Sequence, residues 1–198
     1  MKLSSFGISI SAAALIIYAT ISFGFRASAK VEIQEVTDDA GARAAFLESY
    51  KVFSSPRCVN CHPAGNRILQ GEDSHPDELL TERGKNGRGF SALRCNACHQ
   101  NFNSPGEHAP PGAEDWHLPP PEFPMPFQGK SIRQLCEQLK DRKQNGNRTL
   151  RQVGDHLDTA LVRWAWAPGG SRSIPPIPYK DFVEAFERWR DKGGACPE

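Results

Sequence analysis

The sequence has no block of basic residues. Its 24 lysine and arginine residues are balanced by 23 aspartate and glutamate residues, and both kinds are spread along the 198 positions. Binding to nucleic acid depends on clustered basic side chains that displace counterions from phosphates. The charge pattern therefore argues against nucleic acid as a partner.

Alternating apolar and polar runs and internal repeats are also missing, and hydrophobic residues make up only 38% of the chain. Alternation is the pattern of a half-buried strand, so its absence predicts a mainly α, loop-rich protein. The length fits one compact domain. Apolar residues at helical spacing, together with capping residues, predict helices over residues 38–53, 76–83, 131–139, 149–164 and 179–192.

The first 29 residues have the features of an export signal. Lys2 precedes an apolar run from about Phe6 to Phe25, and Ala27-Ser28-Ala29 supplies the small residues of a cleavage site. We expect cleavage after Ala29, which leaves residues 30–198 as a single periplasmic domain. The apolar run also approaches the roughly 20 residues that span a bilayer, so a retained N-terminal membrane anchor is the alternative.

Two complete Cys-x-x-Cys-His motifs carry most of the chemical information. They are Cys58, Cys61, His62 and Cys95, Cys98, His99. Haem c is attached when two thiols add to the two vinyl groups of the porphyrin, and cysteines three positions apart meet that demand on a helical turn. The histidine that follows becomes the proximal iron ligand. The motifs predict two covalently bound haem c groups, which share one core because His99 follows His62 by only 37 positions.

A zinc site or a redox disulfide is the alternative use of the four motif cysteines. The 33 residues between Cys61 and Cys95 exceed the usual spacing of zinc ribbons, and a zinc site would leave both histidines unexplained. An oxidising compartment also disfavours zinc thiolates. The two other cysteines, Cys136 and Cys196, are predicted to form a disulfide, with two free thiols as the alternative.

The segment from Ser104 to Pro126 is dense in proline and has no helical period, which predicts an ordered loop. Long loops in compact domains usually serve a function, and we expect this one to lie over a large flat cofactor. Trp116, within it, is predicted to pack either on a porphyrin or as a core aromatic residue.

Three residues are candidates for the distal iron ligand: Met125, His117 and His75. Met125 is the only methionine that remains after export, and two prolines frame it. A methionine or histidine at this position would make a closed electron carrier, whereas an open iron would bind peroxide or small gases. His108 and His156 are expected at the surface.

Three runs of the sequence resemble a family of small exported bacterial di-haem proteins that are often labelled isoquinoline 1-oxidoreductase subunits. The runs are Ser54-Ser55-Pro56-Arg57-Cys58-Val59-Asn60-Cys61-His62-Pro63-Ala64-Gly65, Gly112-Ala113-Glu114-Asp115-Trp116-His117-Leu118-Pro119-Pro120 and Cys136-Glu137-Gln138-Leu139-Lys140-Asp141. The resemblance covers nearly all of the mature chain. It implies the six haem-attachment residues above, and a role as electron acceptor of a periplasmic molybdenum hydroxylase rather than as its catalytic subunit.

Together these patterns predict a cytochrome c-like di-haem domain that transfers electrons in the periplasm to or from a redox partner protein such as a dehydrogenase or oxidase. Membrane contact is expected only through the N-terminal anchor, and no catalytic residue is assigned. A peroxidase-like haem enzyme with one open iron is the first alternative, and a zinc-binding interaction module is the second. Binding of carbon monoxide and metal analysis distinguish the three.

Overall fold

The computed structural model describes residues 38–198, so the predicted signal and its cleavage site lie outside the described residues. The described chain belongs to one compact unit. In chain order its elements are α1 (Asp39–Phe53), α2 (Pro56–Val59), β1 (Leu69–Gln70), β2 (His75–Pro76), β3 (Gly89–Phe90), β4 (Leu93–Arg94), α3 (Ile132–Lys140), α4 (Leu150–Leu157), α5 (Ala160–Arg163) and α6 (Tyr179–Asp191), with 3₁₀ turns at Cys95–Ala97 and Trp164–Trp166. The prediction of a mainly α, loop-rich chain is confirmed. Between residues 38 and 198, no helix is both long and apolar enough to cross a membrane.

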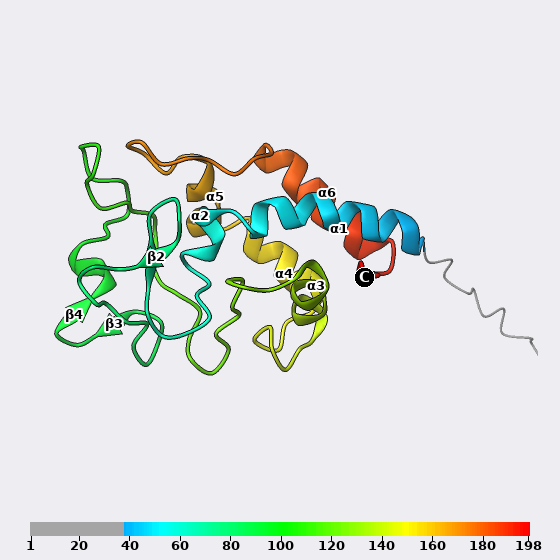
Figure 1. The fold of residues 1–198 in the computed structure, drawn as a ribbon, viewed down its shortest axis with the longest axis horizontal. Helices are drawn as coiled ribbons and strands as arrows, with labels where there is room; N and C mark the ends of the chain where they lie inside the picture. The colour runs from blue at the N-terminus through cyan, green and yellow to red at the C-terminus, as the bar shows by residue number, and fades with distance from the viewer. Residues whose placement is uncertain (1–37) are drawn as a thin grey trace, which may run out of the picture. The chain divides into compact units, whose positions relative to one another are not determined.

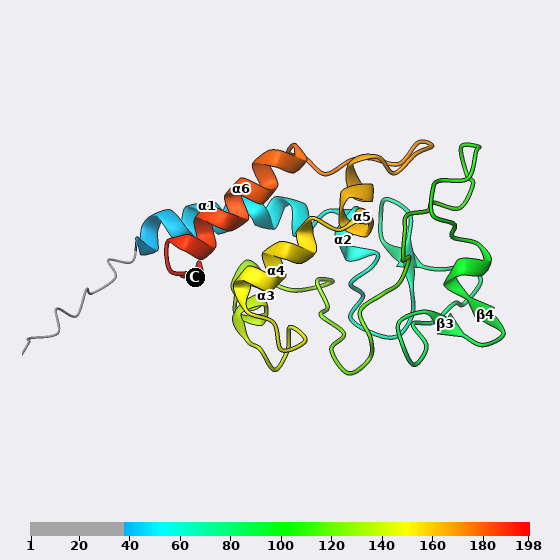
Figure 2. The same cartoon turned by 180° about the vertical axis from the view of Figure 1, so that it is seen from behind.

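Helices α1 and α6 form the centre of the hydrophobic core. They run side by side in opposite directions (Figures 1 and 2). The ring of Phe46 lies 4.9 Å from that of Trp189, and the ring of Phe53 lies 5.2 Å from that of Phe182. All four side chains are buried. Burial of one such large apolar side chain stabilises the fold by about 1.5–3 kcal/mol, so the contact between these two helices contributes much of the stability of the unit.

The predicted disulfide between Cys136 and Cys196 is confirmed. Cys136 lies on α3 and is fully buried in the core, while Cys196 follows α6 near the C-terminus. The bond closes a loop of 60 residues. Ser131 caps α3 as predicted, because its side chain accepts a hydrogen bond from the backbone of Gln134 in a reciprocal capping box.

Two predicted helices differ in the structure. Residues 76–83 form a short strand and a turn, in which Leu80 has φ +56°, a value that an α-helix does not allow. The helix predicted over 149–164 ends at Leu157, and Thr159 begins a separate helix, α5, by accepting a hydrogen bond from Val162 N. Threonine and aspartate side chains compete for backbone hydrogen bonds, so Asp158-Thr159 interrupts the apolar period.

The region between α2 and α3 is irregular apart from two short ladders, β1 with β2 and β3 with β4, an isolated bridge between Arg67 and Glu82, and the 3₁₀ turn at Cys95–Ala97 (Figure 1). The Pro-rich segment 104–126 has neither helix nor strand, as predicted. Its path is tied to the preceding chain at Gly87, whose carbonyl accepts a hydrogen bond from Leu118 N at 2.8 Å. Gly87 has φ +72°, and a Cβ there would lie 1.9 Å from Leu118 O, so only glycine fits.

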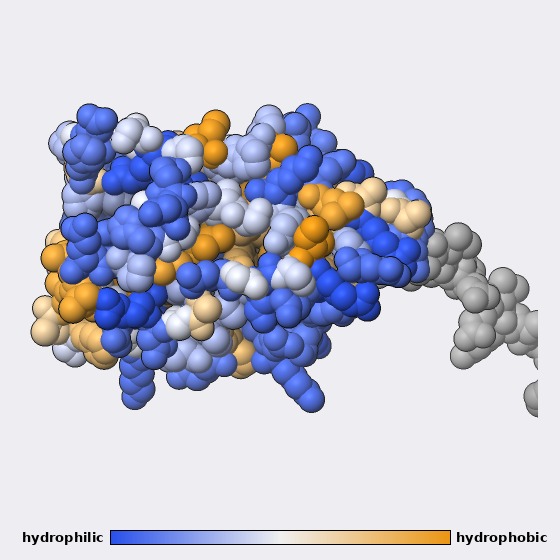
Figure 3. All heavy atoms as spheres, viewed as in Figure 1, coloured by the Kyte–Doolittle hydropathy of each residue, from blue (hydrophilic) through white to orange (hydrophobic). Residues whose placement is uncertain are grey.

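One of the apolar patches on the surface lies over β3 and β4, as Figure 3 shows. Phe90 on β3 and Leu93 on β4 are both exposed there. β4 leads directly into Cys95 of the second motif. Exposed apolar surface on a folded unit commonly marks a contact site for another molecule.

Candidate functional site

The first motif begins on α2. Pro56 occupies the first position of this helix, where its missing N–H leaves no hydrogen bond unmade. The helical turn continues beyond α2, since His62 N donates to Cys58 O at 3.1 Å. This puts the two thiols on one turn, with the histidine directly after them. Burial raises the pKa of Cys58 to about 12 and that of Cys61 to about 11, so both thiols are protonated.

The imidazole of His62 is held on two sides. Its Nδ1 donates a hydrogen bond to the carbonyl oxygen of Met125 at 2.7 Å. Its ring stacks on that of Phe127, with centroids 3.8 Å apart and planes 3° from parallel. Burial lowers the pKa of His62 to about 3, so the ring is neutral. With its one proton at Nδ1, the ring has a lone pair at Nε2 that can bind a metal.

The second motif repeats this arrangement with different residues. Cys95 opens a 3₁₀ turn, and His99 N donates to Cys95 O at 2.9 Å. His99 Nδ1 donates to the carbonyl oxygen of Pro111 at 2.7 Å, and its ring stacks on Trp116 with centroids 4.5 Å apart and planes 8° from parallel. Trp116 in turn packs edge-on against Trp164. Burial lowers the pKa of His99 as well, which favours its neutral form.

Both histidines are thus oriented by the same long segment of chain. Met125 and Pro111 lie in the Pro-rich segment 104–126, and a loop without helix or ladder has carbonyls free to accept hydrogen bonds from side chains. A hydrogen bond from the second ring nitrogen to a carbonyl fixes the tautomer and orientation of a metal-binding histidine and raises its basicity. The two motifs therefore fit covalently attached haem by the spacing of their cysteines, and also by the protonation and orientation of their histidines.

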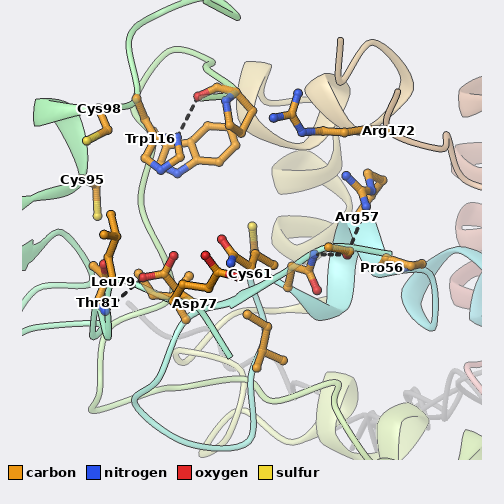
Figure 4. A pocket seen from close by; sticks show the side chains of 18 of the residues that line it. Pro56, Arg57, Cys61, Asp77, Leu79, Thr81, Cys95, Cys98, Trp116 and Arg172 are labelled. Carbon is orange, nitrogen blue, oxygen red and sulfur yellow. Dashed lines mark hydrogen bonds between the residues drawn. The ribbon is translucent and has the colours of Figure 1, made fainter. Parts of the chain in front are cut away.

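A cavity of about 660 Å³ joins the two motifs (Figure 4). Cys61 of the first motif and Cys95, Cys98 and His99 of the second all line it. Trp116 and Trp164 contribute flat aromatic surface to the same cavity. Cys61 and Cys95 are 34 positions apart in sequence, and the fold brings both side chains to one cavity large enough for a bulky cofactor.

Arg83 connects the first motif to the Pro-rich segment. Its side chain is buried, with 1% of the residue exposed, and its guanidinium donates to the carbonyl oxygens of Pro119 at 2.6 Å and Pro124 at 3.1 Å. On the other side it donates to the carbonyls of Pro63 and Gly65, which follow His62. Arg83 therefore fixes the loop that orients both histidines. Proline has no N–H group, so a proline-rich chain offers few other donors to the carbonyl oxygens that Arg83 binds.

The cysteines of the chain divide into two chemical classes. All four motif cysteines have free thiols, whereas Cys136 and Cys196 are joined by a disulfide.

Within residues 38–198, no group of three or more histidine, cysteine, aspartate or glutamate side chains converges in a way that could hold a metal ion.

The candidates for the distal ligand lie in different places. The carbonyl of Met125 faces Nδ1 of His62, so its backbone lies on the side of the ring away from Nε2. His75 lines the cavity together with His99, and its Nδ1 lies 2.6 Å from Asp73 Oδ1. His117 lies outside the cavity lining, with Nδ1 donating to Asp115 O at 2.5 Å. The ligand roles of all three remain predictions.

The two histidines expected at the surface differ from each other. His108 is exposed but also lines the cavity. His156 on α4 is half-buried, and its positive charge is one of the causes that lower the pKa of His62. The expectation of a solvated helix surface is therefore wrong for His156, because α4 turns that side chain toward the interior.

Sequence patterns did not indicate three residues that shape the site: Phe127, Arg83 and Arg57. Phe127 follows Pro126 outside any helix, so no period marks it as buried. Arg83 and Arg57 are charged residues, for which exposure is the default expectation. The available signal is their position, since Arg57 directly precedes the first motif and Phe127 directly follows the Pro-rich segment.

Comparison of the chain with protein-family models, with curated proteins and with solved structures finds no match.

Proposed function

We propose that this chain is a periplasmic di-haem c-type cytochrome that transfers electrons. The observation that carries the proposal is the matched state of His62 and His99. Each ring donates Nδ1–H to a loop carbonyl at 2.7 Å and stacks on an aromatic ring. This leaves Nε2 available to bind a metal. Each histidine directly follows the second of two cysteines with free thiols. A redox disulfide at either motif would need neither feature, and within residues 38–198 no group of three or more histidine, cysteine, aspartate or glutamate side chains converges to hold a zinc ion.

A haem bound at each motif would supply a one-electron iron couple. The thiols of Cys58 and Cys61, and of Cys95 and Cys98, would form the thioether bonds. The remaining contribution of the chain is positional. The carbonyls of Met125 and Pro111 keep the proton on Nδ1, and the stacked rings of Phe127 and Trp116 hold each imidazole in one orientation.

The shared cavity supports transfer between two nearby centres, because side chains of both motifs line it. The exposed apolar residues Phe90 and Leu93, next to Cys95, support this face as the contact site for a redox partner protein. Redox encounters bury small areas and are weak, so a modest patch suffices. A cytochrome c-like fold, and a dehydrogenase or molybdenum hydroxylase as partner, belong to the same proposal.

Haem stoichiometry tests the proposal directly. The exported protein is denatured, extracted with acid acetone and assayed as the pyridine haemochrome. We expect two haems per chain to survive extraction, one in the C58A/C61A variant, one in C95A/C98A and none in the fourfold variant. Asn96→Ala, at an exposed position inside the second motif, is the matched control and keeps two. Wild-type protein that retains no haem after extraction contradicts the proposal.

Carbon monoxide separates a carrier from a haem enzyme. A carrier with both iron atoms closed by six ligands binds the gas slowly, whereas an open iron binds it at once. Rapid binding to one haem of the reduced protein would assign that haem to the peroxidase-like alternative. The single-haem variants identify which motif holds it.

A further inference from the structure

Two arginines, Arg57 and Arg172, lie at one end of the cavity (Figure 4). The side chain of Arg57 is only 4% exposed and lines the cavity, and its buried Nε has no hydrogen-bond partner among the described residues. Arg172 lines the same space, and its guanidinium donates to the carbonyl oxygens of Pro168, Gly169 and Ala109. These hydrogen-bond partners of Arg172 are neutral carbonyls and not carboxylates.

One carboxylate partly balances this pair. Glu72 Oε1 lies 2.6 Å from Arg57 Nη2, and Ser173 also hydrogen-bonds to this carboxylate. Arg172 lies close enough for the charge of Arg57 to lower its pKa, although burial is the larger cause. Glu107, whose backbone lies beside Arg172, also lines the cavity. Arg57 is buried, whereas Arg172 and Glu72 are partly exposed, so this end of the cavity is accessible to a further anion.

Figure 4 shows these arginines across the cavity from the thiols of the second motif. Cys95 and Cys98 lie at one end, with Arg57 and Arg172 at the other, and Trp116 lies between the two ends. On a haem ring, the two vinyl groups that react with cysteines lie on the edge opposite the two carboxylate-bearing side chains. A ring fixed to Cys95 and Cys98 within the cavity would direct its carboxylates toward the arginines.

We propose that Arg57 and Arg172 bind the carboxylates of the haem attached at Cys95 and Cys98. This inference rests on the proposed function. Arginine presents a planar array of N–H donors that matches a carboxylate. The two arginines then act as positioning residues, which set the depth and the reduction potential of the ring that the thioethers hold.

The test uses the C58A/C61A background, in which the second motif holds the only haem. Arg172→Gln and Arg57→Gln are introduced singly, and the midpoint potential is measured by spectroelectrochemical titration. Oxidised haem iron carries one more positive charge than reduced iron, so the loss of a nearby positive charge stabilises the oxidised form and lowers the midpoint potential. We expect the equilibrium constant for reduction to fall up to tenfold, which is about 59 mV for one electron. Arg172→Lys, which keeps the charge, should shift the potential less.

Arg151→Gln is the matched control, since Arg151 is exposed on α4 and outside the cavity lining. Arg57 also pairs with Glu72, so Arg57→Gln affects stability as well. If Arg57→Gln does not fold, the result for Arg172→Gln decides whether the inference holds. A haem that stays attached with the same potential in Arg172→Gln as in Arg151→Gln overturns this inference and leaves the proposed function intact. Protein without any attached haem overturns the function itself.

Discussion

The ring of His99 lies 4.5 Å from the ring of Trp116, with the two planes 8° from parallel. Stacking of this kind restricts rotation of the imidazole about its Cβ–Cγ bond without engaging either nitrogen. It therefore complements the hydrogen bond from Nδ1 to Pro111, and the same combination holds His62 through Phe127 and Met125. These two contacts set the orientation of each histidine.

Replacement of Trp116 by leucine should loosen His99 selectively. The loss of aromatic contacts with His99 and Trp164 is expected to lower the free energy of unfolding by about 1–3 kcal/mol. The potential of the haem at the second motif should change, while that of the haem at the first should not. Trp116→Phe keeps a flat ring and serves as the control in redox titration and urea denaturation. Equal changes at both haems would contradict selective positioning.

Replacement of Arg83 by methionine should be strongly destabilising. The carbonyls of Pro119 and Pro124 would lose their buried donor, at a cost of about 2–5 kcal/mol in unfolding free energy. Urea denaturation measures the effect. Arg67→Met, at an exposed position, is the control and should stay within about 0.5 kcal/mol of wild type. An Arg83 variant as stable as this control would show that the carbonyls find other donors.

Removal of the disulfide should affect stability but not haem attachment. In the chain-entropy model, opening a 60-residue loop lowers the unfolding free energy by about 4 kcal/mol. We expect C136A/C196A to denature at lower urea concentration and still to carry two haems per folded chain. A haem count that fell in the correctly folded fraction would mean that these cysteines take part in attachment.

Acid should destabilise the fold in part through His156. Burial lowers the pKa of His156 in the folded chain, and the positive charges of Arg148 and His117 lower it further. Below the unfolded value of 6.5, the unfolded chain binds a proton that the folded chain resists, so the free energy of unfolding decreases as the pH falls. Above that value this contribution disappears.

Urea denaturation at several pH values between about 5 and 8 measures this dependence. His156→Gln should have a shallower loss of stability on the acid side than wild type. His108→Gln, at an exposed position, is the control and should follow the wild-type curve. Identical curves for His156→Gln and wild type would assign the acid sensitivity to other groups.

Local patterns predicted much of this protein. Apolar residues at helical spacing marked α1 and α6, and the capping residues Ser131 and Thr149 marked the starts of α3 and α4, because these signals act within one turn of chain. Proline density correctly predicted an irregular segment. The chemistry of Cys-x-x-Cys-His is likewise local, since five consecutive residues contain both thiols and the imidazole.

Only the tertiary structure decided which distant groups meet those motifs. Met125 and Phe127 reach His62 across more than 60 positions, and Arg57 reaches the cavity of the second motif from the first. The sequence by itself determined which residues we propose to carry haem, whereas packing decided their tautomer, orientation and electrostatic surroundings. The reason is physical. Every residue has a backbone carbonyl, so the sequence does not mark which carbonyl will accept a given hydrogen bond. Whether a charged side chain is buried depends on the whole fold and not on its neighbours in sequence.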